Sequence, residues 1–133
     1  MNALDLALRQ AGLSLGDAVG RAPTPLTFVV SMRLGEPATT DRLRAWLDLY
    51  PGLRFKLDAT PTWSAALIAE LQATGAVASV DFKGQYRGTI VDAPPDPELY
   101  RRVVDGLPDA WLEDPALTPE TETVLEPHRE RVT

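Results

Sequence analysis

The segment Ala110-Trp111-Leu112-Glu113-Asp114-Pro115 decides how this chain is interpreted. A short apolar run is followed by two carboxylates, and a proline directly after them ends the segment. If the run is a β-strand, Glu113 and Asp114 lie at its carboxyl end. In parallel α/β folds, ligands and catalytic groups collect at this end of the strands. The segment therefore predicts a strand that delivers acidic groups to a site.

Three earlier segments have a similar form, and helical patterns separate them. Thr40, Ser64 and Asp96 are candidate N-caps for those helices, and Pro97 suits the first helical position. Strands alternating with helices favour a parallel sheet with right-handed crossovers. The strands are expected at residues 26–34, 53–58, 77–82 and 110–113.

The predicted strands carry polar residues on one face, although buried strands of an open parallel sheet are usually apolar on both faces. Charges are costly to bury without pairing, metal or water, and the mouth of a barrel interior supplies all three. A solvated sheet face or a buried ion-pair network would also explain them. The polar residues are Thr27, Ser31, Arg33, Arg54, Lys56, Asp58, Ser79, Asp81, Lys83 and Glu113.

The predicted fold is therefore α/β: a partial TIM (β/α)8-type barrel of about four parallel βα units preceded by an N-terminal helix. Residues 1–25 are expected to form a helical lead-in, and residues 26–133 the partial barrel.

Composition excludes several classes of site. The chain has 133 residues, a net charge of −6, no cysteine and one histidine, His128. Thiolate catalysis, a His-based triad and a multi-histidine metal site are therefore excluded. The acidic charge argues against nucleic acid and anionic membranes as partners. No apolar run is long enough to span a bilayer, and a cytoplasmic location is the default expectation.

Carboxylates that converge from neighbouring strand ends would form an oxygen cage suited to Mg²⁺. Lysines beside such a cation lose proton affinity and can act as bases near neutral pH. A divalent cation also stabilises the enolate formed when a proton next to a carboxylate is removed.

Four segments resemble the enolase superfamily, most closely its mandelate-racemase and muconate-lactonising members. Asn2-Ala3-Leu4-Asp5-Leu6-Ala7-Leu8 resembles the helix that leads into the barrel. Phe55-Lys56-Leu57-Asp58 stands where many members have Lys-x-Lys. Val80-Asp81-Phe82-Lys83-Gly84 resembles the Asp-bearing end of the third strand, and Leu112-Glu113-Asp114-Pro115 resembles the Glu-Asp-Pro that ends the fourth.

The resemblance implies a Mg²⁺-dependent lyase, racemase or cycloisomerase that acts on a small-molecule carboxylate. Asp81 and Glu113 would be the first two metal ligands, and Lys56 and Lys83 the candidate acid/base residues. Asp58 stands where the second lysine is expected, which puts lysine-base chemistry in doubt. In a rival register, that of enolase proper, Asp58 is the first ligand and Asp81 is not.

A full barrel needs about 250 residues, so the chain is expected to be the first half of such a barrel and inactive alone. The alternative is a non-catalytic half-barrel that self-associates or acts as an interaction module, through open edges at residues 26–34 and 110–113. A doubly wound nucleotide-binding domain ranks last, because no glycine-rich phosphate loop follows a strand.

Several aromatic residues have simpler interpretations. Trp46 and Tyr50 lie on an apolar helical stripe and are expected in the core. Trp63 is expected to anchor a loop, and Tyr86 with Arg87 to lie in a solvated loop rather than against substrate.

Overall fold

The computed structural model describes residues 3–133, so Asn2, which begins the first enolase-like segment, lies outside the described residues. Within this range the chain forms four strands, six α-helices and one 3₁₀ helix. The strands are β1 (Val30–Met32), β2 (Phe55–Asp58), β3 (Val77–Asp81) and β4 (Trp111–Glu113). The helices are α1 (Ala3–Ala11), α2 (Leu15–Val19), α3 (Asp41–Leu49), α4 (Ala65–Thr74), α5 (Pro97–Gly106), α6 (Pro119–Leu125) and the 3₁₀ helix η1 (Glu126–Arg131).

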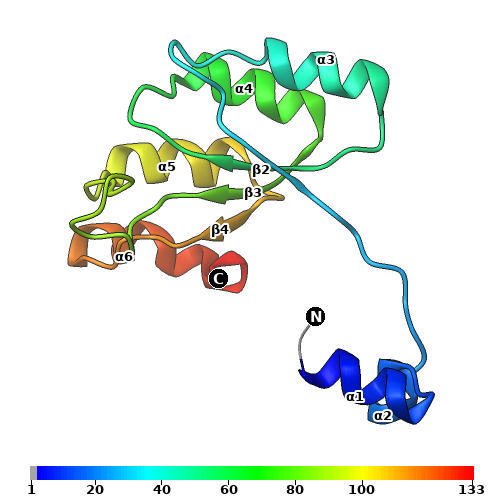
Figure 1. The fold of residues 1–133 in the computed structure, drawn as a ribbon. Helices are drawn as coiled ribbons and strands as arrows, with labels where there is room; N and C mark the ends of the chain where they lie inside the picture. Colours follow the sequence, from blue (N-terminus) through cyan, green and yellow to red (C-terminus); the bar gives the residue numbers. More distant parts are fainter. Residues whose placement is uncertain (1–2) are drawn as a thin grey trace.

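The four strands form one parallel sheet in the order β1-β2-β3-β4, and Figure 1 shows β2, β3 and β4 side by side in chain order. Parallel neighbours need a crossover, and α3, α4 and α5 lie in the three crossovers. Because strand order never reverses, crossovers of one hand place their helices on the same face of the sheet. The prediction of an α/β fold built from parallel βα units is confirmed.

Alternation along the strands separates a covered face from an open one. The core-facing strand residues are at most 7% exposed, and they pack with buried residues of α3 to α6. They are Met32, Phe55, Leu57, Val77, Val80 and Leu112. The other face, called here the bare face, carries Ser31, Lys56, Ser79 and Trp111 in one row of register partners. Ser31 is exposed and Trp111 is 53% exposed, so no described helix covers them.

Helix starts follow the predicted caps with one exception. The Ser64 side chain accepts a hydrogen bond from the Leu67 amide, and the Asp96 side chain accepts one from the Leu99 amide. Thr40 precedes α3 but makes no side-chain cap bond to it. Its buried hydroxyl donates instead to Glu70 at 2.8 Å, so a tertiary contact has replaced the local one.

The first strand is much shorter than predicted. Only Val30–Met32 pairs, whereas Leu26 and Phe28 are 74% and 79% exposed. The reason is the neighbouring strand: β2 begins at Phe55, opposite Val30, and the turn at Pro51 and Gly52 precedes it. Residues 26–29 therefore have no strand partner among residues 3–133, although their composition suits a strand. The other three predicted strands match the structure to within two residues at each end.

Of the predictions for the tryptophan residues and Tyr50, one is wrong and one is confirmed. Trp46 and Tyr50 are 40% and 57% exposed, so their assignment to the core is wrong. The two rings stack on each other at the surface, with centroids 6.1 Å apart. Trp63 is 1% exposed and anchors the β2–α4 loop, as predicted.

The C-terminal residues extend the sheet beyond β4. Val132 forms a parallel bridge with Leu112, and the Thr133 amide donates to the Leu112 carbonyl at 2.9 Å. The expectation of an open edge along residues 110–113 is therefore wrong: Val132 and Thr133 occupy it.

Helices α1 and α2 lie apart from the sheet at the end of an extended linker (Figure 1). Neither helix buries a side chain in the described structure. None of the helices within residues 3–133 is both long and apolar enough to cross a bilayer.

Candidate functional site at the carboxyl ends of the strands

Three carboxylates lie side by side at the carboxyl edge of the sheet. Asp58, Asp81 and Glu113 are the last residues of β2, β3 and β4, and the register pairs Asp58 with Asp81 and Asp81 with Glu113. Adjacent strands lie about 4.8 Å apart, so the three side chains occupy neighbouring positions at one level. The structure thus brings together the acidic residues predicted from the strand ends.

Two lysines lie between these carboxylates. The Lys56 ammonium is 3.0 Å from Asp81 Oδ2 and also donates to Glu113 Oε1. The Lys83 ammonium contacts Asp81 Oδ2 and lies 3.4 Å from Asp58 Oδ1. These five residues are called here the carboxylate–lysine cluster. Its three carboxylates and two ammoniums leave one net negative charge.

Asp81 is the centre of the cluster. Its side chain is 1% exposed, and it accepts hydrogen bonds from the Lys83 ammonium, the Lys83 amide and the Lys56 ammonium. Burial alone would raise the pKa of the Asp81 carboxyl. The hydrogen bonds from Lys83 and Lys56 outweigh burial and lower this pKa below its ordinary value. Asp81 is therefore held ionised.

Both lysines are held in the charged form. Burial lowers the pKa of the Lys56 ammonium, but its hydrogen bonds to Glu113 and Asp81 and the charges of these carboxylates raise that pKa above its ordinary value. For Lys83, burial is likewise outweighed, by the hydrogen bond to Asp81 and the charge of Asp58, and its pKa is also raised. In this arrangement neither lysine is a base near neutral pH.

Two further polar residues complete the edge. Arg33, just after β1, donates from Nε to Asp58 Oδ2 at 2.9 Å, while its side chain stays 66% exposed. Ser79 donates to Glu113 Oε2 at 3.4 Å. Both were among the polar residues of the strand faces but were not predicted as site residues. The sequence signal that could have identified them is the alternation of polar and apolar residues along their predicted strands.

Asp114 also belongs to this edge. Among the described residues, Asp81, Glu113 and Asp114 form a group whose carboxylate oxygens lie within 4.8 Å of one another. Asp58 does not belong to this group. The sequence marked Asp114 as one of two carboxylates after an apolar run, but not as a site residue.

The backbone is constrained at the same place. Lys83 and Asp114 have φ values of 56° and 46°, which are unfavourable for residues other than glycine. Between them, the Gly84 amide donates to the Asp114 carbonyl at 2.7 Å, and a Cβ on Gly84 would lie 2.0 Å from the Ala116 nitrogen. The loops after β3 and β4 are therefore packed backbone against backbone, and such strain often accompanies functional sites.

The loop after β3 also bears on the cluster. The Lys83 ammonium lies 5.2 Å from the centroid of the Tyr86 ring, which is 40% exposed. Tyr86 is thus partly solvated, as predicted, but its ring also contacts the cluster.

The family description "Domain of unknown function (DUF8230) C-terminal domain" matches residues 22–133. The chain belongs to this family. The DUF8230 match begins after α2 and takes in the whole sheet, so every residue of the carboxylate–lysine cluster lies within it. Comparisons with curated proteins and with solved structures found no match.

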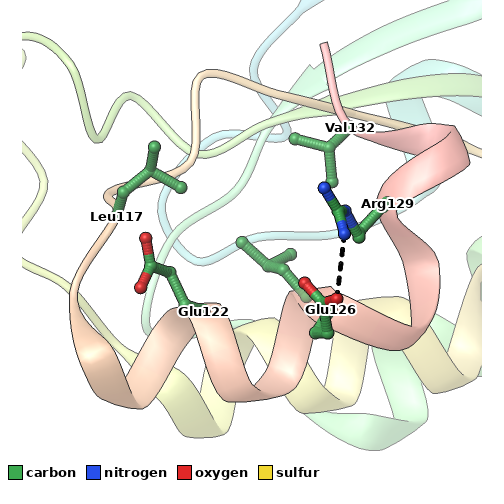
Figure 2. Close-up of a pocket in the computed structure, with 6 residues that line it drawn as sticks. Leu117, Glu122, Glu126, Arg129 and Val132 are labelled. Carbon is green, nitrogen blue, oxygen red and sulfur yellow. Dashed lines mark hydrogen bonds and ion pairs between the residues drawn. The ribbon is translucent and has the colours of Figure 1, made fainter.

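A separate hollow of about 490 Å³ lies beside α6 and η1 in the DUF8230 domain (Figure 2). Figure 2 shows Glu126 and Arg129 joined by an ion pair, with Val132 nearby. The Arg129 nitrogen lies 3.0 Å from the Glu126 oxygen. The apolar walls of the hollow are Leu117, Leu125 and Val132, and it contains no residue of the carboxylate–lysine cluster. The chemically distinctive part of the domain is therefore the strand edge.

Proposed function

We propose that the DUF8230 domain forms half of an enolase-type (βα)8 barrel whose carboxyl edge binds Mg²⁺ and a small carboxylate substrate. Three features of the fold support a barrel. Strand order follows chain order, the described helices cover one face only, and Val132 continues the sheet in parallel beyond β4. A barrel is the arrangement in which such a bare face becomes an interior.

The donor set fits a hard divalent cation. Asp81 and Glu113 end adjacent strands at the same level, and Asp114 offers a third carboxylate oxygen within 4.8 Å. Carboxylate oxygens are the ligands that Mg²⁺ prefers. Asp58 lies outside this group of three converging carboxylates, which supports Asp81 rather than Asp58 as the first ligand. When bound, the cation would stabilise negative charge that develops on a substrate carboxylate next to a departing proton.

The two lysines would supply the positive charge and proton donors of the site. Lys56 lies on β2 and Lys83 after β3, so their ammoniums approach the carboxylates from two strands. Because both are held protonated, they would orient an anionic substrate or donate a proton. The register alignment of Asp58, Asp81 and Glu113 with interleaved lysines is the observation that carries the proposal.

Binding of Mn²⁺, used as a paramagnetic substitute for Mg²⁺, tests this proposal without requiring turnover. We expect Glu113→Gln to weaken Mn²⁺ binding by at least about tenfold, which is about 1.4 kcal/mol. Asp109→Asn, an exposed change at the opposite end of β4, is the control and should leave binding unchanged. Equal Mn²⁺ affinity in the wild type and Glu113→Gln would refute the assignment of Glu113 as a ligand.

A non-catalytic module that pairs with a second copy is the alternative. Two observations favour it: the lysines and carboxylates already neutralise most of each other's charge, and Trp111 is half exposed on an otherwise polar face. Large exposed aromatic residues are common at protein interfaces. Analytical ultracentrifugation distinguishes the two proposals, because a compact dimer that is indifferent to divalent cations would favour the module.

A further inference from the structure

The Lys56 side chain spans two strand spacings to reach Glu113. Lys56 belongs to β2, yet its ammonium contacts Asp81 on β3 and Glu113 on β4. Its side chain is 22% exposed and therefore only partly buried at the strand edge. Lys56 thus neutralises two of the three carboxylates that the proposed metal site would use.

The oxygens of Asp81 are already occupied. Oδ1 accepts the Lys83 amide at 2.9 Å, and Oδ2 contacts both the Lys56 and the Lys83 ammonium. Magnesium binds oxygen at about 2.0–2.1 Å. A cation on Oδ2 would therefore lie close to the Lys56 ammonium, and two like charges at such a distance repel each other.

We propose that Lys56 is an internal counter-cation, so that its ammonium and a divalent cation exclude each other from the Asp81–Glu113 pair. This inference rests on the proposed metal site and concerns how that site is controlled. Four rotatable methylenes allow the Lys56 ammonium to leave the two carboxylates without movement of β2. Its neighbour in register is Ser79, and both lie on the bare face, which no described helix covers.

Charge balance makes this exchange selective for divalent ions. With Lys56 in place, the carboxylate–lysine cluster carries one net negative charge. When the Lys56 ammonium departs, two net negative charges remain, which one divalent cation neutralises and one monovalent cation does not. Na⁺ or K⁺ would exchange one positive charge for another and gain nothing in charge balance.

The test measures Mn²⁺ affinity by electron paramagnetic resonance in the full chain. Lys56→Met removes the competing charge and keeps the length of the side chain, and we expect it to tighten Mn²⁺ binding by about tenfold or more. Arg101→Met, an exposed change on α5 outside the cluster, is the control and should leave affinity unchanged. Circular dichroism establishes that each variant is folded.

The outcomes separate the two proposals. If the wild type binds Mn²⁺ and Lys56→Met binds it equally or more weakly, the counter-cation role is wrong while the metal site stands. If neither binds, both proposals are wrong. If only Lys56→Met binds, Lys56 excludes the metal and the wild-type metal function is wrong.

The wild type offers a second measurement that does not depend on a variant folding. Lys56 and Lys83 are the only lysines in the sequence, so lysine-selective NMR gives two side-chain signals. Diamagnetic Mg²⁺ should shift the Lys56 signal towards that of a solvated lysine. An unmoved Lys56 signal at saturating Mg²⁺ would overturn the proposal.

Discussion

Asp81 is the central charged residue of the strand edge, because its carboxylate is buried and contacts two ammoniums. We expect Asp81→Asn to lower the free energy of unfolding by roughly 3 kcal/mol, at the low end for breaking a buried ion pair. The expected loss of unfolding free energy stays at the low end because each lysine retains one carboxylate partner. Lys56 still contacts Glu113, and Lys83 still lies near Asp58. Urea denaturation measures it, with Asp109→Asn as the exposed control within about 0.5 kcal/mol of wild type.

The same residue gives the acid dependence of stability a definite sign. The folded-state pKa of Asp81 lies below its ordinary value of 3.8, so its stabilisation is complete well above pH 3.8. That stabilisation is lost as the pH falls from about 4 through the lower folded-state pKa. The difference in unfolding free energy between wild type and Asp81→Asn should therefore shrink below pH 4. A constant difference from pH 7 to pH 2 would contradict this prediction.

Gly84 tests the backbone packing beside the site. A Cβ at this position would lie 2.0 Å from the Ala116 nitrogen and 2.6 Å from its Cα, and neither backbone atom can rotate away. We expect Gly84→Ala to cost about 3 kcal/mol, at the upper end for overpacking. Gly52→Ala is the matched control, because no atom lies within 4 Å of its Cβ position. Thermal melts that ranked the two variants equally would mean that the loops separate easily.

At this scale the sequence identifies the charged groups but not their partners. Asp58, Asp81 and Glu113 are predictable because each ends an alternating or apolar run. The pairing of Arg33 with Asp58, and of Lys56 with Glu113, depends on which strands are neighbours and on how far side chains reach. These pairings can be identified only from the register of the strands in the structure.

At the scale of secondary structure, Arg131 joins η1 to the end of α5. Its guanidinium donates to the carbonyls of Val104, Leu107 and Ala110 at 2.9–3.2 Å. These are carbonyls at and just beyond the end of a helix, where a cation is also favoured by the helix dipole. Arg131 therefore holds the C-terminal segment against the end of α5 and the loop that leads into β4.

We expect Arg131→Met to cost about 2 kcal/mol, the range for hydrogen bonds from a charged group. It should also speed hydrogen exchange of the Thr133 amide, which pairs with Leu112. Arg129→Met is the control, because the Arg129 side chain is 73% exposed and its ion pair with Glu126 is worth little. Unchanged Thr133 exchange in Arg131→Met would show that the bridge holds without this contact.

Most helix and strand positions can be predicted from the local sequence pattern. The predictions that failed did so because of contacts between distant parts of the chain. Ser64 and Asp96 cap their helices as predicted, because the cap bond involves only the next three residues. Residues 26–29 fail as a strand for lack of a partner, and Thr40 exchanges its cap for Glu70. Val132 pairs with Leu112 of β4, about twenty residues earlier in the chain. The segment around Val132 is too short to show a strand pattern in the sequence.

At the scale of the whole molecule, crossovers of one hand explain both the strand order and the bare face. Four parallel strands in chain order leave Ser31, Lys56, Ser79 and Trp111 on a face with no described helix. A doubly wound sheet would cover both faces, because its strand order reverses. The bare face is therefore a consequence of topology, and the proposed barrel is one way to complete it.

The family match and the burial pattern divide the molecule at the same place. The match begins at residue 22, while α1 and α2 bury no side chain. We expect a chain of residues 22–133 to unfold with a free energy within about 0.5 kcal/mol of the full chain, since little surface is buried by the removed part. Its urea m value should also be unchanged, because m follows the surface exposed on unfolding.

The matched control removes residues 126–133 instead. That change deletes Arg131 and the Val132 bridge, and it exposes the edge of β4. We expect it to lower both the free energy of unfolding and the m value, because contacts with the sheet are lost. If removal of residues 1–21 proved as costly as removal of residues 126–133, α1 and α2 would have to pack on the sheet in solution. The bare face, with the half-exposed Trp111, would then be the first surface to probe, by tryptophan fluorescence of the two truncated chains.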